Sequence, residues 1–339
     1  MPSTVRIGVI GTGSLGKEHA RIYAELAQSG RVEFSGVYDV NGEAARSQAV
    51  RHGVRAFVSI AEAIQGSDAL SVVTPTVTHH AIARELLQAG RHVLVEKPMT
   101  DNSVQAQELV TLAQDRGLVL QVGHVERFNP VFSYLEKAAP FPRFIECHRL
   151  SPFPARSTDI GVVLDLMIHD LDVVLAFVKS PVVSVDAVGI PVLSGSEDIA
   201  NARIRFENGC VANLTASRIS PERLRKIRVF SGGEKPVYIS LDYRAQEGFI
   251  YRLAREGEEE SSLLKKLLSA RESTLVSEFG GRRIVREAVP INKDEPLKLE
   301  LAHFLECVRE RHAPKVSGAQ AKVALDVAFE ITRQIGACV

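Results

Sequence analysis

The sequence predicts an α/β Rossmann domain with a doubly wound parallel sheet, followed by an α+β domain with a large, mostly antiparallel open sheet. In the first part of the chain, short apolar runs alternate with helical patterns, which is typical of a parallel sheet covered by helices. In the second part, strand-like runs follow one another closely with turn signals between them, which is typical of antiparallel pairing.

The first strand is expected at residues 5–10, and a helical pattern continues through residue 27. Between them lies a glycine-rich run that we predict to bind a dinucleotide: Gly11, Thr12, Gly13, Ser14, Leu15 and Gly16. Gly11 permits the tight turn, Gly13 lets the backbone approach a pyrophosphate, and Gly16 lets the helix pack on its strand. The phosphates would rest on the N-terminus of the helix.

A second strand, expected at residues 33–38, ends at Asp39. The Asp39 carboxylate can accept hydrogen bonds from the adenosine ribose of the cofactor. Val40 and Asn41 follow, without the arginine that would receive a 2′-phosphate. The sequence therefore predicts NAD as the cofactor and NADP as the less favoured one, with Arg46 as the residue that keeps NADP open.

Further strands are expected at 69–73, 92–96 and 119–123, with helices at about 78–89 and 103–116. Thr74 and Pro75 follow one strand, and Glu96 and Lys97 end another. Pro98 biases Lys97 toward an extended backbone, so its ammonium is presented at the carboxyl edge of the sheet, where open α/β sheets bind ligands. We add Thr74, Pro75, His79, Glu96 and Lys97 to the predicted cofactor-binding residues.

The character of the chain changes after Gly123, and we expect a Rossmann domain at 1–124 and a substrate-binding and oligomerisation domain at 125–339. Strands are expected at 144–149, 182–190, 202–206, 211–217, 226–230 and 237–242. Two C-terminal helices, at 297–311 and 319–335, have apolar spacing that indicates packing, and we expect them to pack back toward the first domain.

Asp165, His169 and Asp172 have the spacing i, i+4 and i+7, which stacks them on one face of a helix, while Asp170 points away. Polar groups on an otherwise apolar helix are costly to bury unless they are used or paired. A hydrogen-bond network between helices is one alternative to a catalytic role. A divalent metal site is another; no further ligand cluster is evident, so no metal is predicted.

Four motifs together are far more specific than any one of them: the glycine run, Thr74-Pro75-Thr76-Val77-Thr78-His79, Glu96-Lys97-Pro98 and Asp165-Leu166-Met167-Ile168-His169. They resemble the Gfo/Idh/MocA family of glucose–fructose oxidoreductase and inositol dehydrogenase. The resemblance implies a two-domain NAD(P)-dependent oxidoreductase that acts on sugars or cyclitols and assembles as a homodimer or homotetramer through the second-domain sheet. The family often has glycine where this chain has Met167.

The segments 123–130 and 156–166 resemble more narrowly the branch that oxidises the 3-hydroxyl of UDP-N-acetylglucosamine-type sugar nucleotides. Arg127, Arg149 and Arg156 flank the proposed pocket, and guanidinium groups suit a pyrophosphate. We predict Arg127 and Arg156 as substrate contacts near the diphosphate, with Lys97, Asp165 and His169 near the reacting hydroxyl.

For catalysis we expect His169 to act as general base, because a histidine pKa near 6.5 suits proton removal near neutrality. Lys97 would polarise the same hydroxyl, Asp165 would orient His169 or bind a neighbouring hydroxyl, and Asp172 would support His169 from behind. Two alternatives are a dehydrogenase of an unactivated sugar or inositol, and a non-catalytic NAD-binding regulator of the same fold. Intact Lys97, Asp165 and His169 argue against the regulator.

The 339 residues carry 41 Lys and Arg against 41 Asp and Glu, so there is no overall field to attract nucleic acid or a membrane. Four cysteines lack metal or redox spacing, which favours a reduced environment without disulfides: Cys147, Cys210, Cys307 and Cys338. The chain begins directly with the first strand, and no signal core or membrane-spanning run is evident. We expect a cytoplasmic protein.

Overall fold

The computed structural model describes residues 4–30, 32–153, 160–234, 236–254 and 274–337. They form two compact units. Unit 1 comprises the residues up to Phe128 together with Glu295–Asp326, and unit 2 comprises Asn129–Asp294 together with the residues from Val327 onward. Each unit is described by itself below.

Unit 1 contains a six-stranded, fully parallel sheet in the order β3-β2-β1-β4-β5-β6. The strands are β1 (Val5–Ile10), β2 (Val32–Tyr38), β3 (Arg55–Ala56), β4 (Ala69–Val72), β5 (His92–Glu96) and β6 (Leu120–Gly123). The strand order reverses direction between β1 and β4, and ligands of open α/β sheets bind outside the carboxyl ends of the strands at such a switch point.

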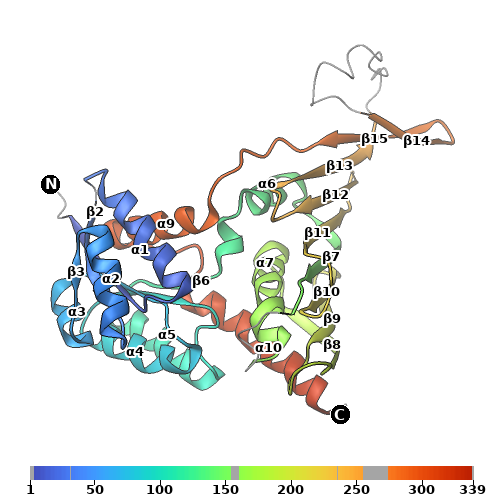
Figure 1. The fold of residues 1–339 in the computed structure, drawn as a ribbon. Helices are drawn as coiled ribbons and strands as arrows, with labels where there is room; N and C mark the ends of the chain where they lie inside the picture. The colour runs from blue at the N-terminus through green and yellow to red at the C-terminus, as the bar shows by residue number, and fades with distance from the viewer. Residues whose placement is uncertain (1–3, 31, 154–159, 235, 255–273, 338–339) are drawn as a thin grey trace. The chain divides into compact units, whose positions relative to one another are not determined.

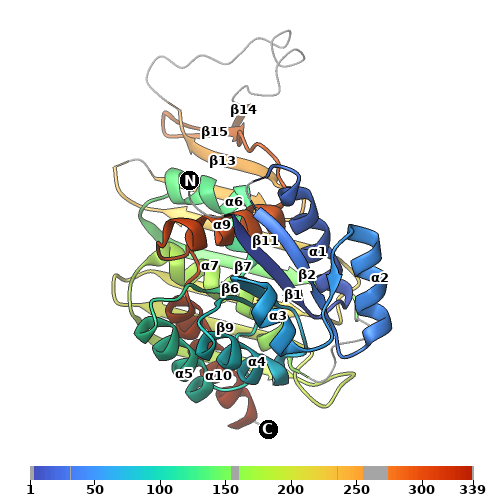
Figure 2. The same cartoon turned by 90° about the vertical axis from the view of Figure 1, so that its left-hand side faces the viewer.

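Helices flank this sheet (Figure 2). They are α1 (Ser14–Ala27), α2 (Gly42–His52), α3 (Ile60–Gly66), α4 (Thr76–Gln88), α5 (Ser103–Asp115) and α9 (Pro296–Glu310), with the first part of α10 (Gly318–Ala337). One apolar core joins Ile7 of β1, Tyr23 of α1 and Phe304 of α9, all fully buried. The parallel Rossmann sheet predicted from the sequence is confirmed. The chain between Asn41 and Ala69, which no predicted element covers, forms α2, β3 and α3.

Unit 2 contains a nine-stranded sheet in the order β14-β15-β13-β12-β11-β7-β10-β9-β8. The strands are β7 (Pro142–Leu150), β8 (Val182–Ile190), β9 (Ile199–Phe206), β10 (Val211–Ser217), β11 (Leu224–Ser231), β12 (Val237–Asp242), β13 (Glu247–Leu253), β14 (Thr274–Phe279) and β15 (Arg282–Ala288). All neighbours are antiparallel except β7 and β10. The expected antiparallel sheet is confirmed, and it is larger than predicted because β13, β14 and β15 extend it.

Two helices of unit 2, α6 (Pro130–Ala138) and α7 (Ile168–Val178), lie on one face of this sheet (Figure 1). Buried Ile145 and Cys147 of β7 alternate along the strand with half-buried residues of the other face. Arg149 of β7 is 2% exposed and donates to both carboxylate oxygens of Asp170 in α7, at 3.0 and 2.8 Å. Arg149, which we expected beside the substrate, therefore fastens α7 to the sheet.

The segment that carries Asp165 is not the continuous α-helix predicted from its spacing. Residues Val163–Met167 form a π-turn in which the backbone N–H of Ile168 donates to the carbonyl of Val163, five residues back. Asp165 lies in this turn and His169 is the second residue of α7; both are half-buried. Asp172, one turn further along, is 2% exposed. Insertions of this kind into helices occur frequently at functional sites.

Glu197 holds the entrance to the π-turn. Its carbonyl accepts the N–H of Val162 at 2.9 Å, and its carboxylate accepts the N–H of Val163 at 3.2 Å. The same carboxyl group packs on Gly161 so closely that a Cβ there would lie 1.9 Å from it. N–H groups in the first turn of a helix lack acceptors within the helix. Glu197 supplies acceptors for two of them, those of Val162 and Val163.

The loop that presents Glu197 is fixed by a fully buried ion pair between Asp198 and Arg218, 2.8 Å apart. One Asp198 oxygen also accepts the N–H groups of Val192, Leu193 and Ser194 at 2.6 to 2.9 Å. Burial would raise the pKa of Asp198, but these donors and Arg218 hold it well below its ordinary value. Arg218 also donates to the carbonyl of Ile160 at 2.7 Å. We call residues 192–198 with Arg218 the latch.

Among the described residues, no helix is long and apolar enough to cross a bilayer. Cys147, Cys210 and Cys307 are buried thiols, and Cys338 lies outside the described residues.

The latch predicts a thermodynamic coupling between Gly161 and Glu197. Gly161→Ala should lower the free energy of unfolding by about 1 to 3 kcal/mol, because the added methyl group overpacks the Glu197 carboxyl group. In a Glu197→Ala background the same substitution should cost less by at least about 0.5 kcal/mol, since the colliding atoms are gone. Denaturant unfolding of the four proteins of the cycle measures this.

Gly195→Ala in the same loop is the matched control, because a Cβ there meets no atom within 4 Å among the described residues. Its free energy of unfolding should stay close to that of the wild type. Equal costs for Gly161→Ala with and without the Glu197 carboxyl group would contradict the packing described for the latch.

Candidate active site

The glycine turn after β1 has the geometry that a dinucleotide requires. Gly11 has φ +95°, and a Cβ there would lie 2.2 Å from the carbonyl oxygen of Val73. A Cβ on Gly16 would lie 2.0 Å from the carbonyl oxygen of Gly11. Around Gly13, in contrast, no described atom lies within 4 Å of where a Cβ would stand. Gly11 and Gly16 therefore close the turn, and the backbone at Gly13 is open to a ligand.

The N-terminus of α1 suits an anion. Its N-cap is Gly13, which offers no side chain to cap the helix, and the first turn carries no acidic residue. The positive end of the helix dipole thus has no side-chain counter-charge from its own first turn. The diphosphate of a dinucleotide would fit here, held by the backbone N–H groups that follow Gly13.

Asp39, one residue beyond β2, lies beside this turn. One carboxylate oxygen accepts the backbone N–H of Thr12 at 2.7 Å and the Thr12 hydroxyl at 2.9 Å, and the other accepts the N–H of Asn41 at 2.8 Å. Partial burial raises the pKa of Asp39, but these hydrogen bonds outweigh it and hold the pKa below its ordinary value. Asp39 is therefore a fixed carboxylate, able to accept the hydroxyls of a ribose.

Glu96 ends β5 and is buried directly before Lys97. Its carboxylate lies 3.1 Å from Nε2 of His19 in α1 and accepts the N–H of Lys97 at 3.3 Å. A Cβ on Gly123 would lie 2.6 Å from this carboxylate, so the end of β6 has room only for glycine. Burial raises the pKa of Glu96, but His19 and Lys97 bring it below its ordinary value. The buried carboxylate of Glu96 thus lies against the backbone of Lys97, which is half-buried.

His19 is a residue that sequence reasoning missed. It is 0% exposed and stands in α1 beside the buried Ala20, Ile22 and Tyr23. A polar side chain on the apolar face of a helix was the available signal, since such a group needs a partner. The partner, Glu96, is 77 residues away, and only the folded sheet brings the two together.

His79, predicted to bind cofactor, is 1% exposed and lies between two loops at the carboxyl edge of the sheet. Nδ1 is 2.9 Å from the carbonyl oxygen of Pro98, and Nε2 is 2.8 Å from that of Thr74. Burial lowers the pKa of His79. Both ring nitrogens therefore face backbone carbonyl oxygens, those of Thr74 and of Pro98, which follows Lys97. A contact of His79 with the cofactor stays a prediction.

The predicted catalytic residues belong to different units. Lys97 lies in unit 1, and Asp165 and His169 lie in unit 2, where the latch and α7 position them. Within each unit, hydrogen bonds from neighbouring residues hold the segments that carry these side chains. Their joint action on one substrate stays a prediction.

Of the arginines predicted to contact a diphosphate, Arg156 lies outside the described residues. Arg127 stands in a short 3₁₀ turn, Val125–Phe128, where it is 5% exposed and donates to the carbonyl of Lys315 at 3.1 Å. Arg127 therefore has a structural contact inside unit 1. Its contact with a substrate stays a prediction.

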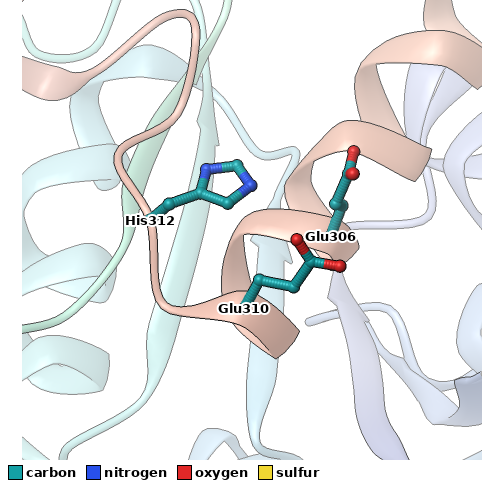
Figure 3. A group of neighbouring side chains, drawn as sticks. All are labelled: Glu306, Glu310 and His312. Carbon is teal, nitrogen blue, oxygen red and sulfur yellow. The ribbon is translucent and has the colours of Figure 1, made fainter.

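Among the described residues, one set of three side chains has the spacing of metal ligands: Glu306, Glu310 and His312, at the end of α9 (Figure 3). All three are exposed, Glu310 pairs with Arg309 at 2.7 Å, and Nδ1 of His312 lies 3.1 Å from the carbonyl oxygen of Ala313. Asp165, His169 and Asp172 do not form such a set in the described part of unit 2.

Comparison with known proteins agrees with this geometry. Residues 5–124 match the model of an oxidoreductase family with an NAD-binding Rossmann fold, named GFO_IDH_MocA, and residues 141–234 match the GFO/IDH/MocA C-terminal domain. The chain is 37% identical, over 96% of its length and 96% of the relative, to UDP-N-acetylglucosamine 3-dehydrogenase of Acidithiobacillus ferrooxidans. It is 25% identical to scyllo-inositol 2-dehydrogenase (NAD(+)) of Bacillus subtilis, over 98% of this chain and 94% of the relative.

A solved structure of UDP-N-acetylglucosamine 3-dehydrogenase from Acidithiobacillus ferrooxidans superposes with a TM-score of 0.85 at 35% identity and covers 99% of both chains. The matched region includes the glycine turn, Glu96-Lys97-Pro98 and the segment with Asp165 and His169, so both units take part in the likeness. The resemblance drawn from the motifs is confirmed: the chain belongs to the GFO/IDH/MocA family of oxidoreductases.

Proposed function

We propose that this oxidoreductase oxidises the 3-hydroxyl of a UDP-activated N-acetylhexosamine and passes the hydride to NAD. The observation that carries the proposal is the 37% identity, over almost the whole chain, to a protein named for that reaction. The fixed carboxylate of Asp39, the open turn at Gly13 and the Glu96–Lys97 pair supply the parts that such a reaction needs.

The cofactor would be held by unit 1. The N–H groups at the start of α1 suit its diphosphate, and Asp39 suits the ribose diol. NAD, when bound, supplies the hydride acceptor. Asp39 disfavours a 2′-phosphate by its charge, whereas Arg46 of α2, whose Nη1 lies 3.3 Å from where a Cβ on Gly42 would stand, is the nearby cation that would favour one. The relative strength of these two charge effects determines whether the site prefers NAD or NADP.

In the proposed reaction the carbon–hydrogen bond at carbon 3 breaks and its electron pair leaves as hydride, while the hydroxyl proton passes to His169 and a ketone forms. Lys97 donates a hydrogen bond to the same oxygen and stabilises the developing alkoxide. Asp165 orients His169 or binds a neighbouring hydroxyl, and Asp172 supports His169 from within α7. Arg127 and Arg156 are the proposed contacts near the diphosphate.

A dehydrogenase of an unactivated sugar or inositol is the second candidate. The 25% identity to scyllo-inositol 2-dehydrogenase, over 98% of the chain, favours it. Such a substrate carries no diphosphate, so no arginine would be needed to hold one. A non-catalytic regulator is less well supported, because Lys97, Asp165 and His169 are all present.

We also propose that the enzyme is a homodimer or homotetramer assembled through the sheet of unit 2. On the face opposite α6 and α7, four aromatic rings form a ladder across β7, β11, β12 and β13: Phe144, Phe230, Tyr238 and Tyr251, with successive ring centroids 5.5, 4.6 and 5.0 Å apart. Phe230 is 37% exposed. An antiparallel sheet with such a second face is suited to cover by another chain.

The cofactor assignment predicts that Asp39→Ala weakens NAD binding roughly tenfold or more, the scale of a lost charge-assisted hydrogen bond. NADP binding should weaken much less, because its 2′-phosphate gains from the removal of a negative charge. Asp39→Asn keeps an oxygen that can accept the hydrogen bonds of Thr12. It therefore distinguishes the effect of losing the charge from the effect of losing the contacts that hold the glycine turn. Dissociation constants of both dinucleotides decide the point; tighter binding of NADP by the wild type would overturn the assignment.

The catalytic assignment predicts that Lys97→Ala and His169→Asn each slow hydride transfer by about two to four orders of magnitude, the usual scale for acid–base groups. NADH affinity should stay close to that of the wild type. Single-turnover absorbance of the nicotinamide measures the step. His80→Asn, a change at the histidine paired with Glu108, is the control and should leave the rate unchanged. A nearly wild-type rate for His169→Asn would place the base elsewhere.

The substrate assignment predicts NADH formation with UDP-N-acetylglucosamine in the presence of a carbonyl trap, and little with myo-inositol or free glucose. Arg156→Ala should raise KM for the sugar nucleotide roughly tenfold, because it removes one charge-assisted contact. The rate with an unphosphorylated sugar should respond little to that change. Turnover confined to the unphosphorylated compounds would promote the second candidate.

The oligomer assignment predicts a solution mass that is a multiple of the chain mass, measured by light scattering after size exclusion. Phe230→Glu should shift the mass toward that of one chain, because it places a charge in the middle of the aromatic ladder. Phe141→Glu, at a side chain that is 70% exposed outside the ladder, is the control. A wild-type protein with the mass of one chain would overturn the assignment.

A further inference from the structure

A cavity of about 500 Å³ lies in unit 1 at the amino-terminal ends of β1, β4 and β5. Because the strands are parallel, this edge of the sheet is opposite to the edge with the glycine turn and Lys97. The cavity is lined by ten residues, of which four are arginines and one is an acid: Arg6, Arg91, Arg309, Arg311 and Asp68. In a chain whose charges balance overall, this is a local excess of positive charge.

Two of the four arginines are already compensated. Arg6 donates to both oxygens of Asp68, at 3.2 and 2.7 Å, and its backbone N–H donates to the same carboxylate. Arg309 pairs with Glu310 at 2.7 Å. Arg91 and Arg311 have no side-chain hydrogen bond or ion pair among the described residues, and Nε of Arg91 is shielded from solvent. Among the described residues, Arg91 and Arg311 therefore have no hydrogen-bonded counter-ion, and the charge of Arg91 acts on Asp68 only through space, where it lowers the pKa of that carboxyl group.

His92, the first residue of β5, supplies a third unmatched donor. It is 4% exposed and lines the cavity. Its Nδ1 accepts the backbone N–H of Val119 at 2.9 Å, so the proton of the neutral ring is on Nε2. Burial and the charge of Arg311 lower the pKa of His92 to about 4, so the ring is neutral at pH 7. No described residue accepts the Nε2 proton.

We propose that this cavity binds a small anion that carries a phosphate group. Arg91 and Arg311 supply two charges, which match those of a phosphate dianion, and a guanidinium donates to two oxygens at once. His92, which lines the cavity, adds a neutral donor. The volume falls within the range of small-molecule sites. The inference does not depend on the substrate proposed above.

The site has a direct covalent connection to the residues at the other edge of the sheet. The strand β5 runs from His92 to Glu96 and is followed at once by Lys97. An anion bound at His92 would therefore contact the first residue of the strand whose far end presents the lysine.

The experiment titrates inorganic phosphate and, separately, uridine monophosphate into the full-length protein by calorimetry. Saturating NADH is present so that the dinucleotide site is filled, and ionic strength is constant. Arg91→Gln combined with Arg311→Gln should weaken phosphate binding at least tenfold. The matched control is Arg51→Gln, which removes one exposed charge from α2, away from the cavity. The affinity for NADH should be the same in all these proteins.

Binding of inorganic phosphate that is lost in the double variant supports the proposal. Binding of the nucleotide alone, lost in the same variant, also supports it and identifies a phosphate ester as the ligand. Phosphate binding that survives in the double variant places the anion elsewhere and overturns the proposal. So does a wild-type protein that binds no phosphate and whose nucleotide affinity is either absent or unchanged in the double variant. Failure of the sugar-nucleotide assay would leave all these outcomes unaffected.

Discussion

The buried carboxylate of Glu96 is the constraint on which the arrangement of unit 1 depends. A carboxylate is expensive to remove from water, so it persists only where donors compensate for lost hydration. His19 supplies one donor from the helix behind the glycine turn, and the N–H of Lys97 supplies another. Gly123 must lack a side chain for the carboxylate to fit. One anion therefore sets the positions of α1, β5 and β6 relative to one another, and with them the base of Lys97.

In unit 2, two buried ion pairs fix the elements that surround the candidate catalytic residues. Arg149 with Asp170 fixes α7 on the sheet, and Arg218 with Asp198 fixes the loop that carries Glu197. Removing one partner of a buried pair leaves an uncompensated charge, so such pairs tolerate change poorly. The segment with Asp165 and His169 is thus held at both of its ends, at the entrance by Glu197 and along α7 by Arg149. Precise placement of polar groups is what an enzyme requires of its supporting residues.

The sequence was informative wherever structure is determined locally. Glycine spacing, strand alternation and turn signals predicted β1, β8, β10 and β12 with the observed bounds, and the four motifs predicted the family. The contacts that position the segments of the candidate site were not predictable from the sequence, because they join residues far apart in the chain. Glu197 and Val163 are 34 residues apart, and His19 and Glu96 are 77 apart. The π-turn begins at such a contact, which the sequence does not reveal, and the regular spacing of Asp165 and His169 predicted an ordinary helix instead.

His79 lies between two loops and faces a backbone carbonyl oxygen of each. A neutral imidazole carries one N–H, yet His79 faces two carbonyl oxygens, one from Thr74 and one from Pro98. Because burial favours the neutral ring, only one of the two oxygens receives a proton at any moment. The tautomer of a single side chain therefore decides which loop is held by a hydrogen bond and which is only in contact. Transfer of one proton across the ring would exchange the two.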